Sequence, residues 1–182
     1  MEYLKTITLK DGRQCCLRNG TEQDGQAALD IFTLTHEQTD YLLSYPDENQ
    51  AHTAEKESEF LKEKTESCNE IEILAEVDGC IAGAAGINAI GSKYKVRHRA
   101  EFGISIDRRF WGLGIGRALT DACIECARAA GYEQIELNVV ADNENAIALY
   151  QKAGFAEYGR NPRGFKSRVS GYQELISMRL EL

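Results

Sequence analysis

The sequence predicts an α/β (α+β) fold built on a mixed β-sheet, and three observations support this prediction. Residues 101–106 (EFGISI) alternate bulky residues with small or polar ones, as a half-buried strand does. Residues 118–129 repeat apolar side chains at steps of three and four, the period of an amphipathic helix. Turn pairs such as Asp78-Gly79, between apolar runs, favour antiparallel hairpins elsewhere in the chain.

The residue pattern of the N-terminal third predicts a hairpin followed by helices. Residues 3–18 form two short strand-like runs around the turn residues 10–12 (KDG). Thr21, with Asp24 three positions later, is typical of a helix cap, and a helical apolar face follows. Residues 37–48 predict a short helix that runs into a turn at Pro46-Asp47. Residues 53–67 predict a charged helix.

The remaining residues predict alternating strands and helices within one domain, residues 1–182. The hairpin at Asp78-Gly79 joins the first two of these strands, and Gly131 is a natural helix terminator. Residues 159–170 (GRNPRGFKSRVS) are predicted to be a loop. The predicted elements are strands at 71–77, 80–90 and 97–106, a helix at 114–130, a strand at 133–140, a helix at 143–153, and strands at 155–158 and 172–182.

Composition narrows the class of protein. The 182 residues carry a net charge of −8, which argues against a nucleic-acid partner. A basic cluster at 93–99 (KYKVRHR) is short and isolated, and we interpret it as a hairpin tip. No apolar run approaches the length of a transmembrane helix, and the first residues lack the apolar core of a signal peptide. We therefore expect no membrane partner and a cytoplasmic location.

The six cysteines and three histidines do not predict a metal site. Cys123 and Cys126 form a C-x-x-C pair, but they lie in a helical pattern without a second pair at zinc spacing. In a reducing compartment such cysteines are most simply small buried hydrophobes. We expect no metal.

The most informative segment is 108–117 (RRFWGLGIGR), where three alternating glycines lie between the strand and the helix. Such a turn exposes unpaired backbone N–H groups at the positive end of a helix, which favours a phosphate. The spacing G-x-G-x-G fits neither a Walker loop nor a dinucleotide fingerprint. A structural turn without a ligand is the alternative. We predict a phosphorylated cofactor.

A second segment makes the interpretation specific. The run WGLGIGRAL is followed, about 25 residues on, by NENAIALYQKAGF at 143–155. Together they resemble the GCN5-related N-acetyltransferase (GNAT) superfamily, which has a pyrophosphate loop followed by N-x-x-A-x-x-L-Y-x-x-x-G-F. The resemblance covers roughly residues 71–182. Where the family usually has Gln or Arg at the start of the loop, this chain has Trp111.

The resemblance implies a mostly antiparallel sheet in which two parallel strands splay apart and receive the pantetheine arm of acetyl-CoA. The backbone of Ile104 and Ile106 is then expected to pair with that arm, and the turn amides are expected to hold the pyrophosphate. Arg117 either adds charge or is simply solvated, and Asn143 either contacts the cofactor, caps the next helix, or does both. The expected cofactor-binding residues are Ile104, Ile106, Gly112, Leu113, Gly114, Ile115, Gly116, Arg117 and Asn143.

The resemblance also implies acyl transfer to an amine by direct attack in a ternary complex. Tyr150 matches the tyrosine that protonates the leaving thiolate in many relatives; otherwise it is a core aromatic. Glu101 is a candidate base, although it lies one residue away from the usual register and so points to the other face unless a bulge intervenes. Glu136, Asn138 or solvent are the alternatives.

The sequence leaves the acceptor open. Substrate recognition is expected from residues 37–48, 93–98 and 159–170, whose charges suit either an acidic acceptor or a cationic amine. The predicted activity is transfer of an acetyl group from acetyl-CoA to a primary amine of a small molecule or protein. The alternatives are a non-catalytic acyl-CoA sensor and an enzyme that uses another acyl-CoA. By resemblance, a homodimer through the last strands is also conceivable.

Overall fold

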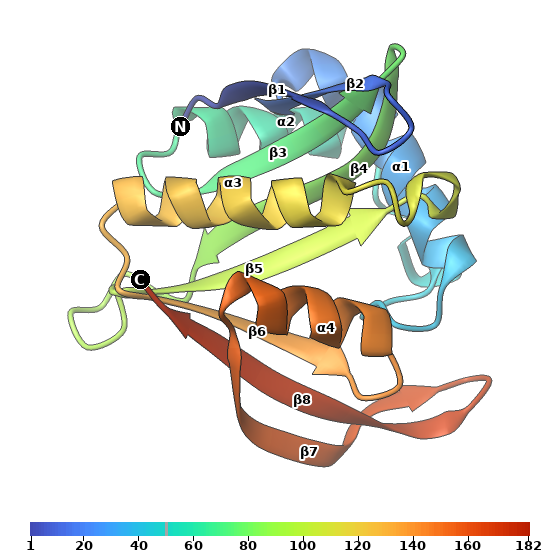
Figure 1. Cartoon of the computed structure of the whole chain (residues 1–182), viewed down its shortest axis with the longest axis vertical. Coiled ribbons are helices and arrows are strands. Elements are labelled where there is room, and N and C mark those ends of the chain that lie inside the picture. Colours follow the sequence, from blue (N-terminus) through green and yellow to red (C-terminus); the bar gives the residue numbers. More distant parts are fainter. Residues whose placement is uncertain (50) are drawn as a thin grey trace.

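A single twisted β-sheet organises the chain (Figure 1). The computed structural model describes residues 1–49 and 51–182. Within them the sheet has eight strands in the order β1-β2-β3-β4-β5-β6-β8-β7. The strands are β1 (Leu4–Thr8), β2 (Gln14–Asn19), β3 (Ile71–Val77), β4 (Cys80–Ala89), β5 (Arg99–Ile106), β6 (Gln134–Val140), β7 (Ala156–Ser167) and β8 (Gly171–Glu181). β5 and β6 are parallel, and the other neighbours are antiparallel.

Helices cover both faces of the sheet. α3 and α4 lie over one face, and α1 and α2 lie over the other (Figure 1). Short 3-10 helices occupy 22–24, 46–49 and 108–110. None of the described helices has the length and apolarity that a bilayer crossing requires. The α-helices are α1 (Gly25–Gln38), α2 (Ala54–Glu66), α3 (Ile115–Ala129) and α4 (Glu144–Ala153).

The predicted turn and cap residues account for several of these boundaries. Asp78 and Gly79 have φ angles of 52° and 78°, which give the tight turn between β3 and β4. The Asp24 carboxylate accepts a hydrogen bond of 2.8 Å from the Thr21 N–H just before α1. Gly154 ends α4 with a φ of 103°, in the left-handed region that glycine adopts without steric cost.

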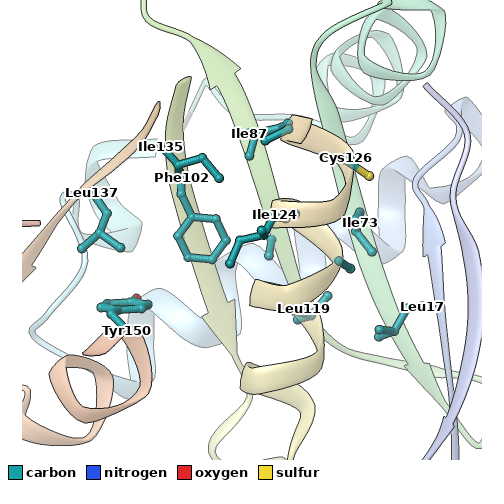
Figure 2. Close-up of a cluster of buried hydrophobic side chains, with 14 of the residues drawn as sticks. Leu17, Ile73, Ile87, Phe102, Leu119, Ile124, Cys126, Ile135, Leu137 and Tyr150 are labelled. Carbon is teal, nitrogen blue, oxygen red and sulfur yellow. The ribbon is translucent and has the colours of Figure 1, made fainter. Parts of the chain in front are cut away.

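The main core lies between the sheet and α3 (Figure 2). The amphipathic period predicted for 118–129 is confirmed, because the apolar face of α3 is buried against β3, β4 and β5. Cys123 and Cys126 belong to this buried face, and all six cysteines are free thiols. Buried side chains that meet here include Leu17, Ile73, Ile87, Phe102, Leu119 and Ile135.

The predicted separation of two parallel strands is confirmed. β5 and β6 pair at only three positions, from Arg99 opposite Gln134 to Glu101 opposite Glu136. Beyond Glu101, β5 continues to Ile106 while it pairs with β4 alone. The sheet is therefore open between the C-terminal parts of β5 and β6, and Figure 1 shows the two strands diverging.

The predicted short helix at 37–48 is wrong. α1 continues to Gln38, residues 39–45 are irregular, and a 3-10 helix spans Pro46–Asn49. The irregular part is held by side chains instead of helical hydrogen bonds, since the Asp40 carboxylate accepts from the Tyr45 hydroxyl at 2.8 Å. The Thr39 hydroxyl also accepts from the Tyr41 N–H at 3.3 Å, and such a bond from a side chain to the backbone competes with helix formation.

The predicted boundary between a short strand at 155–158 and a loop at 159–170 is also wrong. β7 extends from Ala156 to Ser167 and forms a long hairpin with β8. Pro162 and Gly164 suggested a loop, but β7 is an edge strand, where a residue without an N–H is tolerated. The pairing with β8 shifts between Asn161 and Phe165, so the irregularity is accommodated inside the strand.

Candidate active site

The glycine turn leads directly from β5 into α3. Gly112 and Gly114 have φ angles of 77° and 104°, so both adopt the left-handed conformation that disfavours other residues. A Cβ atom at either position would meet nothing within 4 Å, which means that both glycines face open space. The Lys10 N–H donates to the Leu113 carbonyl at 3.1 Å and ties the turn to the β1–β2 hairpin.

Six consecutive backbone N–H groups of this turn are free for a ligand. Among the residues that the structure describes, none accepts a hydrogen bond from the N–H groups of residues 112–117. Three of them belong to the first turn of α3, where the helix dipole adds positive potential. The arrangement therefore fits an anion such as a pyrophosphate.

Basic side chains lie at the same end. Lys10, Arg117 and Lys152 line the cavity beside the turn. Arg117 is half exposed; it pairs with Asp121 at 2.8 Å and donates to the Lys152 carbonyl at 3.0 Å. Its charge is thus partly compensated by Asp121, and the free turn amides are the better-placed donors for an anion.

The open edge of β5 carries Ile104 and Ile106. Both side chains are half-buried on the α3 face, because Ile106 lies where a methyl group at Gly116 would touch it at 3.3 Å. The Trp111 indole N–H donates to the Ile106 carbonyl at 2.8 Å. This contact gives a structural role to the tryptophan that departs from the family pattern: it fixes the turn to the end of β5.

A cavity of about 850 Å³ runs from the glycine turn through the gap in the sheet. From the α4 side it is lined by residues such as Leu149 and Tyr150. From the α1 side it is lined by Thr35 and Leu42. A cavity of this kind lets one ligand approach from each face of the sheet and meet the other at the gap.

Tyr150 lies on α4 beside this gap. Its side chain is 7% exposed, and its ring packs edge-on against Phe102 of β5 with centroids 6.1 Å apart (Figure 2). The hydroxyl makes no hydrogen bond with any described residue, and the side chain lines the cavity. Burial raises the pKa of the Tyr150 phenol above its ordinary value, so the group remains a proton donor at neutral pH.

Glu101 lies on the opposite face of the sheet from Phe102. The pairing of β4 with β5 is continuous from Gly83–Ile106 to Ala89–Ala100, so no bulge changes its direction. Its side chain is exposed and lines the large cavity, opposite Asn88 on β4 and Glu136 on β6. It therefore faces the side from which α1 and residues 39–49 approach.

The two alternative residues, Glu136 and Asn138, already have side-chain partners. Arg99 forms an ion pair with Glu136 and holds the pKa of that carboxyl below its usual range. The Asn138 amide oxygen accepts from the Ser177 hydroxyl at 2.8 Å. Asn138 lines the cavity, whereas Glu136 does not.

Asn143 is a helix cap, as its spacing predicts. Its side-chain oxygen accepts from the Ala146 N–H at 3.3 Å at the start of α4. Asn143 also lines the large cavity, so the cap and a ligand contact are compatible.

The end of the cavity away from the turn is bordered by segments that are distant in the sequence. Asp40 accepts hydrogen bonds from Ser167 at 2.6 Å and Ser170 at 3.2 Å, which lie at the β7–β8 turn. Arg168 pairs with Asp47 at 2.7 Å. The acidic residues of 37–48 therefore hold the β7–β8 hairpin in place, and Tyr41, Leu43 and Phe165 line the cavity mouth instead.

Sequence reasoning missed several residues of the site. Lys10 and Lys152 lie in segments that the sequence analysis used for other reasons, and their contribution depends on how the N-terminal hairpin and α4 lie beside the turn. Glu72, on β3, is a further omission: it borders a smaller cavity next to the large one. No group of three or more potential metal ligands occurs among the described residues.

The sequence and the fold that carry this site are similar to those of known proteins. Residues 32–155 match the model of the Acetyltransferase (GNAT) family, which is more than half of the chain. The chain belongs to this family.

Individual relatives agree in fold. An acetyltransferase of GNAT family from Streptococcus pneumoniae has a TM-score of 0.87 and 29% identity, with 92% of this chain and 99% of that chain covered. The putative acetyltransferase yncA from Salmonella typhimurium, whose structure contains acetyl-CoA, has a TM-score of 0.80 at 19% identity, with 92% and 94% covered. This second likeness concerns the fold alone.

A curated relative is similar in sequence over a shorter region. The L-amino acid N-acetyltransferase AaaT of Escherichia coli is 35% identical over 85 residues, which are 46% of this chain and 52% of AaaT. The similarity thus spans about half the length of AaaT.

Proposed function

We propose that the chain is an acetyl-CoA-dependent N-acetyltransferase that transfers an acetyl group to a primary amine of a small molecule or a protein. The proposal places the reaction in a ternary complex, by direct attack of the amine. The observation that carries it is the cavity of about 850 Å³ that joins six free backbone N–H groups, through a gap in the sheet, to an opening on the other face.

On the donor side, the N–H groups of Gly112 to Arg117 would hold the pyrophosphate, with Lys10 and Lys152 adding charge. The backbone of Ile104 and Ile106, at the open edge of β5, would pair with the pantetheine arm. Because Trp111 occupies the Ile106 carbonyl, we expect Ile104 to carry more of this pairing. Asn143 would contact the donor while it caps α4.

On the chemical side, Tyr150 is proposed to protonate the leaving sulfur. It is buried, protonated and without a protein hydrogen-bond partner among the described residues, which leaves its hydroxyl for a ligand. Glu101 is proposed to remove a proton from the amine, because it lies at the cavity on the face from which the acceptor would enter.

The proposal extends to the location of the protein. The six free thiols, Cys123 and Cys126 among them, suit a reducing compartment, and we propose that the protein is cytoplasmic.

The test is a calorimetric titration with acetyl-CoA, CoA and succinyl-CoA, followed by a thiol-release assay with a panel of amines and peptides. We expect saturable binding of acetyl-CoA and thiol release that depends on an amine. Tight CoA binding without turnover of any thioester would indicate a sensor instead. A preference for succinyl-CoA would mean that the acyl donor is not acetyl-CoA. Absence of CoA binding would contradict the proposal.

A further inference from the structure

A second, smaller cavity adjoins the large one on the α1 side of the sheet. It has a volume of about 200 Å³. The two cavities share Leu42 and residues 103–105 of β5 as lining. A group bound in the small cavity would therefore lie next to the gap where acyl transfer is proposed.

The sheet forms one wall of the small cavity, and two neighbouring residues of this wall are glycines. Gly86 of β4 lies directly opposite Gly103 of β5, and Glu72 of β3 lies opposite Gly86 on its other side. The Glu72 carboxylate leans across the strand into the space above Gly86, where a Cβ atom would collide with its Oε2. A Cβ at Gly103 would meet nothing within 4 Å, so the space between Glu72 and β5 is open.

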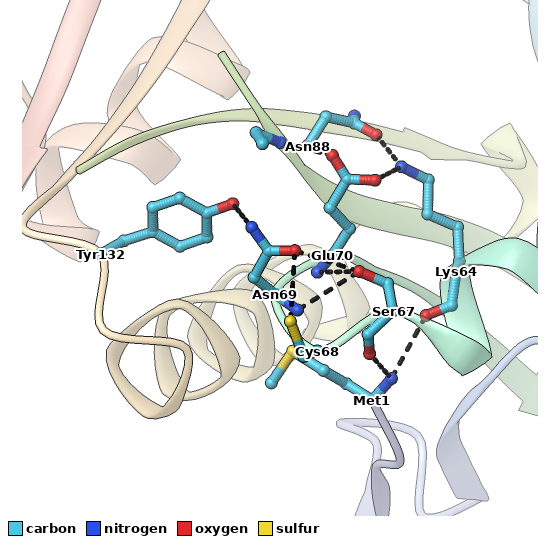
Figure 3. Close-up of polar contacts among 9 residues, drawn as sticks. Met1, Lys64, Ser67, Cys68, Asn69, Glu70, Asn88 and Tyr132 are labelled. Atoms are coloured by element: carbon cyan, nitrogen blue, oxygen red, sulfur yellow. Dashed lines mark hydrogen bonds and ion pairs between the residues drawn. The ribbon is translucent and has the colours of Figure 1, made fainter. Parts of the chain in front are cut away.

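Glu72 has no partner of its own. Within residues 1–49 and 51–182, its carboxylate makes no hydrogen bond or ion pair. The nearest cation, Lys64 of α2, is held by Glu70 at 2.6 Å and by the Asn88 amide oxygen at 2.5 Å (Figure 3). The other nearby carboxylate, Glu57, is paired with His52.

The remaining walls suit an organic cation. Phe32 and His36 of α1 line the cavity with their rings 3.9 Å apart. Burial lowers the pKa of His36, which keeps its ring neutral at pH 7. Aromatic faces and a free carboxylate together are the groups that bind an alkylammonium ion.

We propose that Glu72 binds the ammonium group of the acceptor in this cavity, and that the acceptor is a cationic primary amine without a neighbouring carboxylate. The proposal rests on the proposed function and names the substrate class of that same site. Gly86 and Gly103 make room for the ammonium group between Glu72 and the gap. Glu72 recognises the substrate, and Glu101 keeps its proposed role as the proton acceptor.

Once Glu72 is ionised, the charges around the cavity disfavour an amino acid as the acceptor. An α-carboxylate bound beside the ammonium group would face Glu72 and lie on the same side of the sheet as Glu101. Lys64, the cation that would offset this repulsion, is already engaged by Glu70. A carboxylate brought among like charges without a counterion is disfavoured.

Acceptor binding is then linked to pH. Burial, with the nearby charge of Glu57, raises the pKa of Glu72 to about 8, so the carboxylate ionises as the pH rises toward that value and the affinity for an ammonium ion increases. The titratable groups around Glu72 are Glu57 and Lys64 of α2, His36 of α1, Glu101 of β5 on the same face, and Cys123 of α3 across the sheet.

The substrate test uses matched pairs that differ by one carboxylate: phenethylamine and phenylalanine, and cadaverine and lysine. With the intact chain and saturating acetyl-CoA, we expect kcat/KM to be at least tenfold higher for the amine of at least one pair. Equal or higher values for both amino acids would overturn the proposal, as would turnover of peptides alone. If acetyl-CoA itself does not bind, the proposed function fails instead.

The residue test compares Glu72→Gln with Glu101→Gln, using the preferred amine. We expect Glu72→Gln to raise the acceptor KM by about 30-fold or more, with a much smaller change in kcat and in acetyl-CoA affinity. The wild-type KM should fall as the pH rises from about 6 to 8, and this dependence should vanish in Glu72→Gln. Glu101→Gln should act on kcat.

Glu76→Gln is the matched control, because Glu76 is on the same strand and pairs with Arg18 at 3.1 Å, away from both cavities. Gly103→Ala adds a methyl group to open space at the passage between the cavities and should also raise the acceptor KM while leaving thermal stability unchanged. An unchanged KM and pH dependence in Glu72→Gln, with wild-type activity present, would overturn the assignment.

Discussion

The two ends of the large cavity are built in different ways. The end at the glycine turn, the proposed donor end, presents mainly backbone: six N–H groups from residues 112–117, which are contiguous in the sequence. The other end, the proposed acceptor end with the small cavity beside it, is made of side chains from α1, from residues 39–43, from the β7–β8 hairpin and, in the small cavity, from β3. The first depends on the conformation of one turn. The second depends on how four distant segments pack.

This difference teaches where specificity lies in the molecule. Backbone amides can bind a pyrophosphate of suitable shape whatever side chains surround them, so the proposed donor end depends little on side-chain identity. Side chains such as Glu72 and Leu42 are the groups proposed to distinguish one amine from another. Changes at the donor end should therefore affect every reaction of the protein, and changes at the acceptor end should affect only the choice of amine.

The largest effect is expected at Gly114. In Gly114→Val, a branched side chain would enter the space before the free N–H groups and would strain the φ of 104°. We expect acetyl-CoA affinity to fall by roughly 100-fold or more, as measured by calorimetry.

Gly131→Val is the control for strain. Gly131 has a φ of 79° and open space around it, but it lies at the other end of α3. It should lose stability in a similar way and keep its affinity for acetyl-CoA. Equal losses of affinity in both variants would mean that the turn does not bind the donor.

The next effect concerns Tyr150. Tyr150→Phe keeps the packing against Phe102 but removes the proposed acid, so we expect kcat to fall by roughly 100-fold with acetyl-CoA affinity nearly unchanged. Because burial raises the pKa of Tyr150, the wild type should not lose this acid up to about pH 10.

A suitable control for Tyr150 is Tyr132→Phe, which removes another buried tyrosine hydroxyl, bonded to Asn69 at 2.9 Å outside the cavity. Steady-state kinetics of both variants, compared by kcat, test whether the Tyr150 hydroxyl is the acid. Unchanged kcat in Tyr150→Phe would assign protonation of the sulfur to another group.

The smallest effect is expected at Asp40. Ser167 donates to Asp40 and lowers the pKa of its carboxyl, so this group holds residues 39–49 to the β7–β8 hairpin at neutral pH. Asp40→Ala should loosen the acceptor end and raise the acceptor KM by about fivefold, without a change in acetyl-CoA affinity. A change in donor affinity instead would show that the two ends are not independent.

The same contrast explains what could be predicted from the sequence. The strand at 101–106, the glycine turn and the helix after it have local signals, and the structure has each of them. The splayed strands follow from the family resemblance and are confirmed by the short pairing of β5 with β6. Local periodicity and turn chemistry were sufficient for this half of the molecule.

The acceptor end could not be predicted in the same way. Pro162 and Gly164 read as a loop because no local signal shows that β7 is an edge strand. The charges of residues 37–48 were expected to suit a substrate, yet Asp40 accepts a hydrogen bond from Ser167 and Asp47 pairs with Arg168 of the hairpin. Glu72 looks like an ordinary outward residue of a strand until the glycine on the next strand is known.

The separate construction of the two ends has a consequence for evolution and engineering. Residues 41–43 and Phe165, at the mouth of the cavity, contribute nothing to the glycine turn, so they can drift without disturbing recognition of the shared donor. A library that varies these positions, with 112–117 held constant, should yield variants that accept new amines from one unaltered pool of donor. The fold thereby separates the glycine turn, which the donor requires, from the residues at the mouth of the cavity, which can vary.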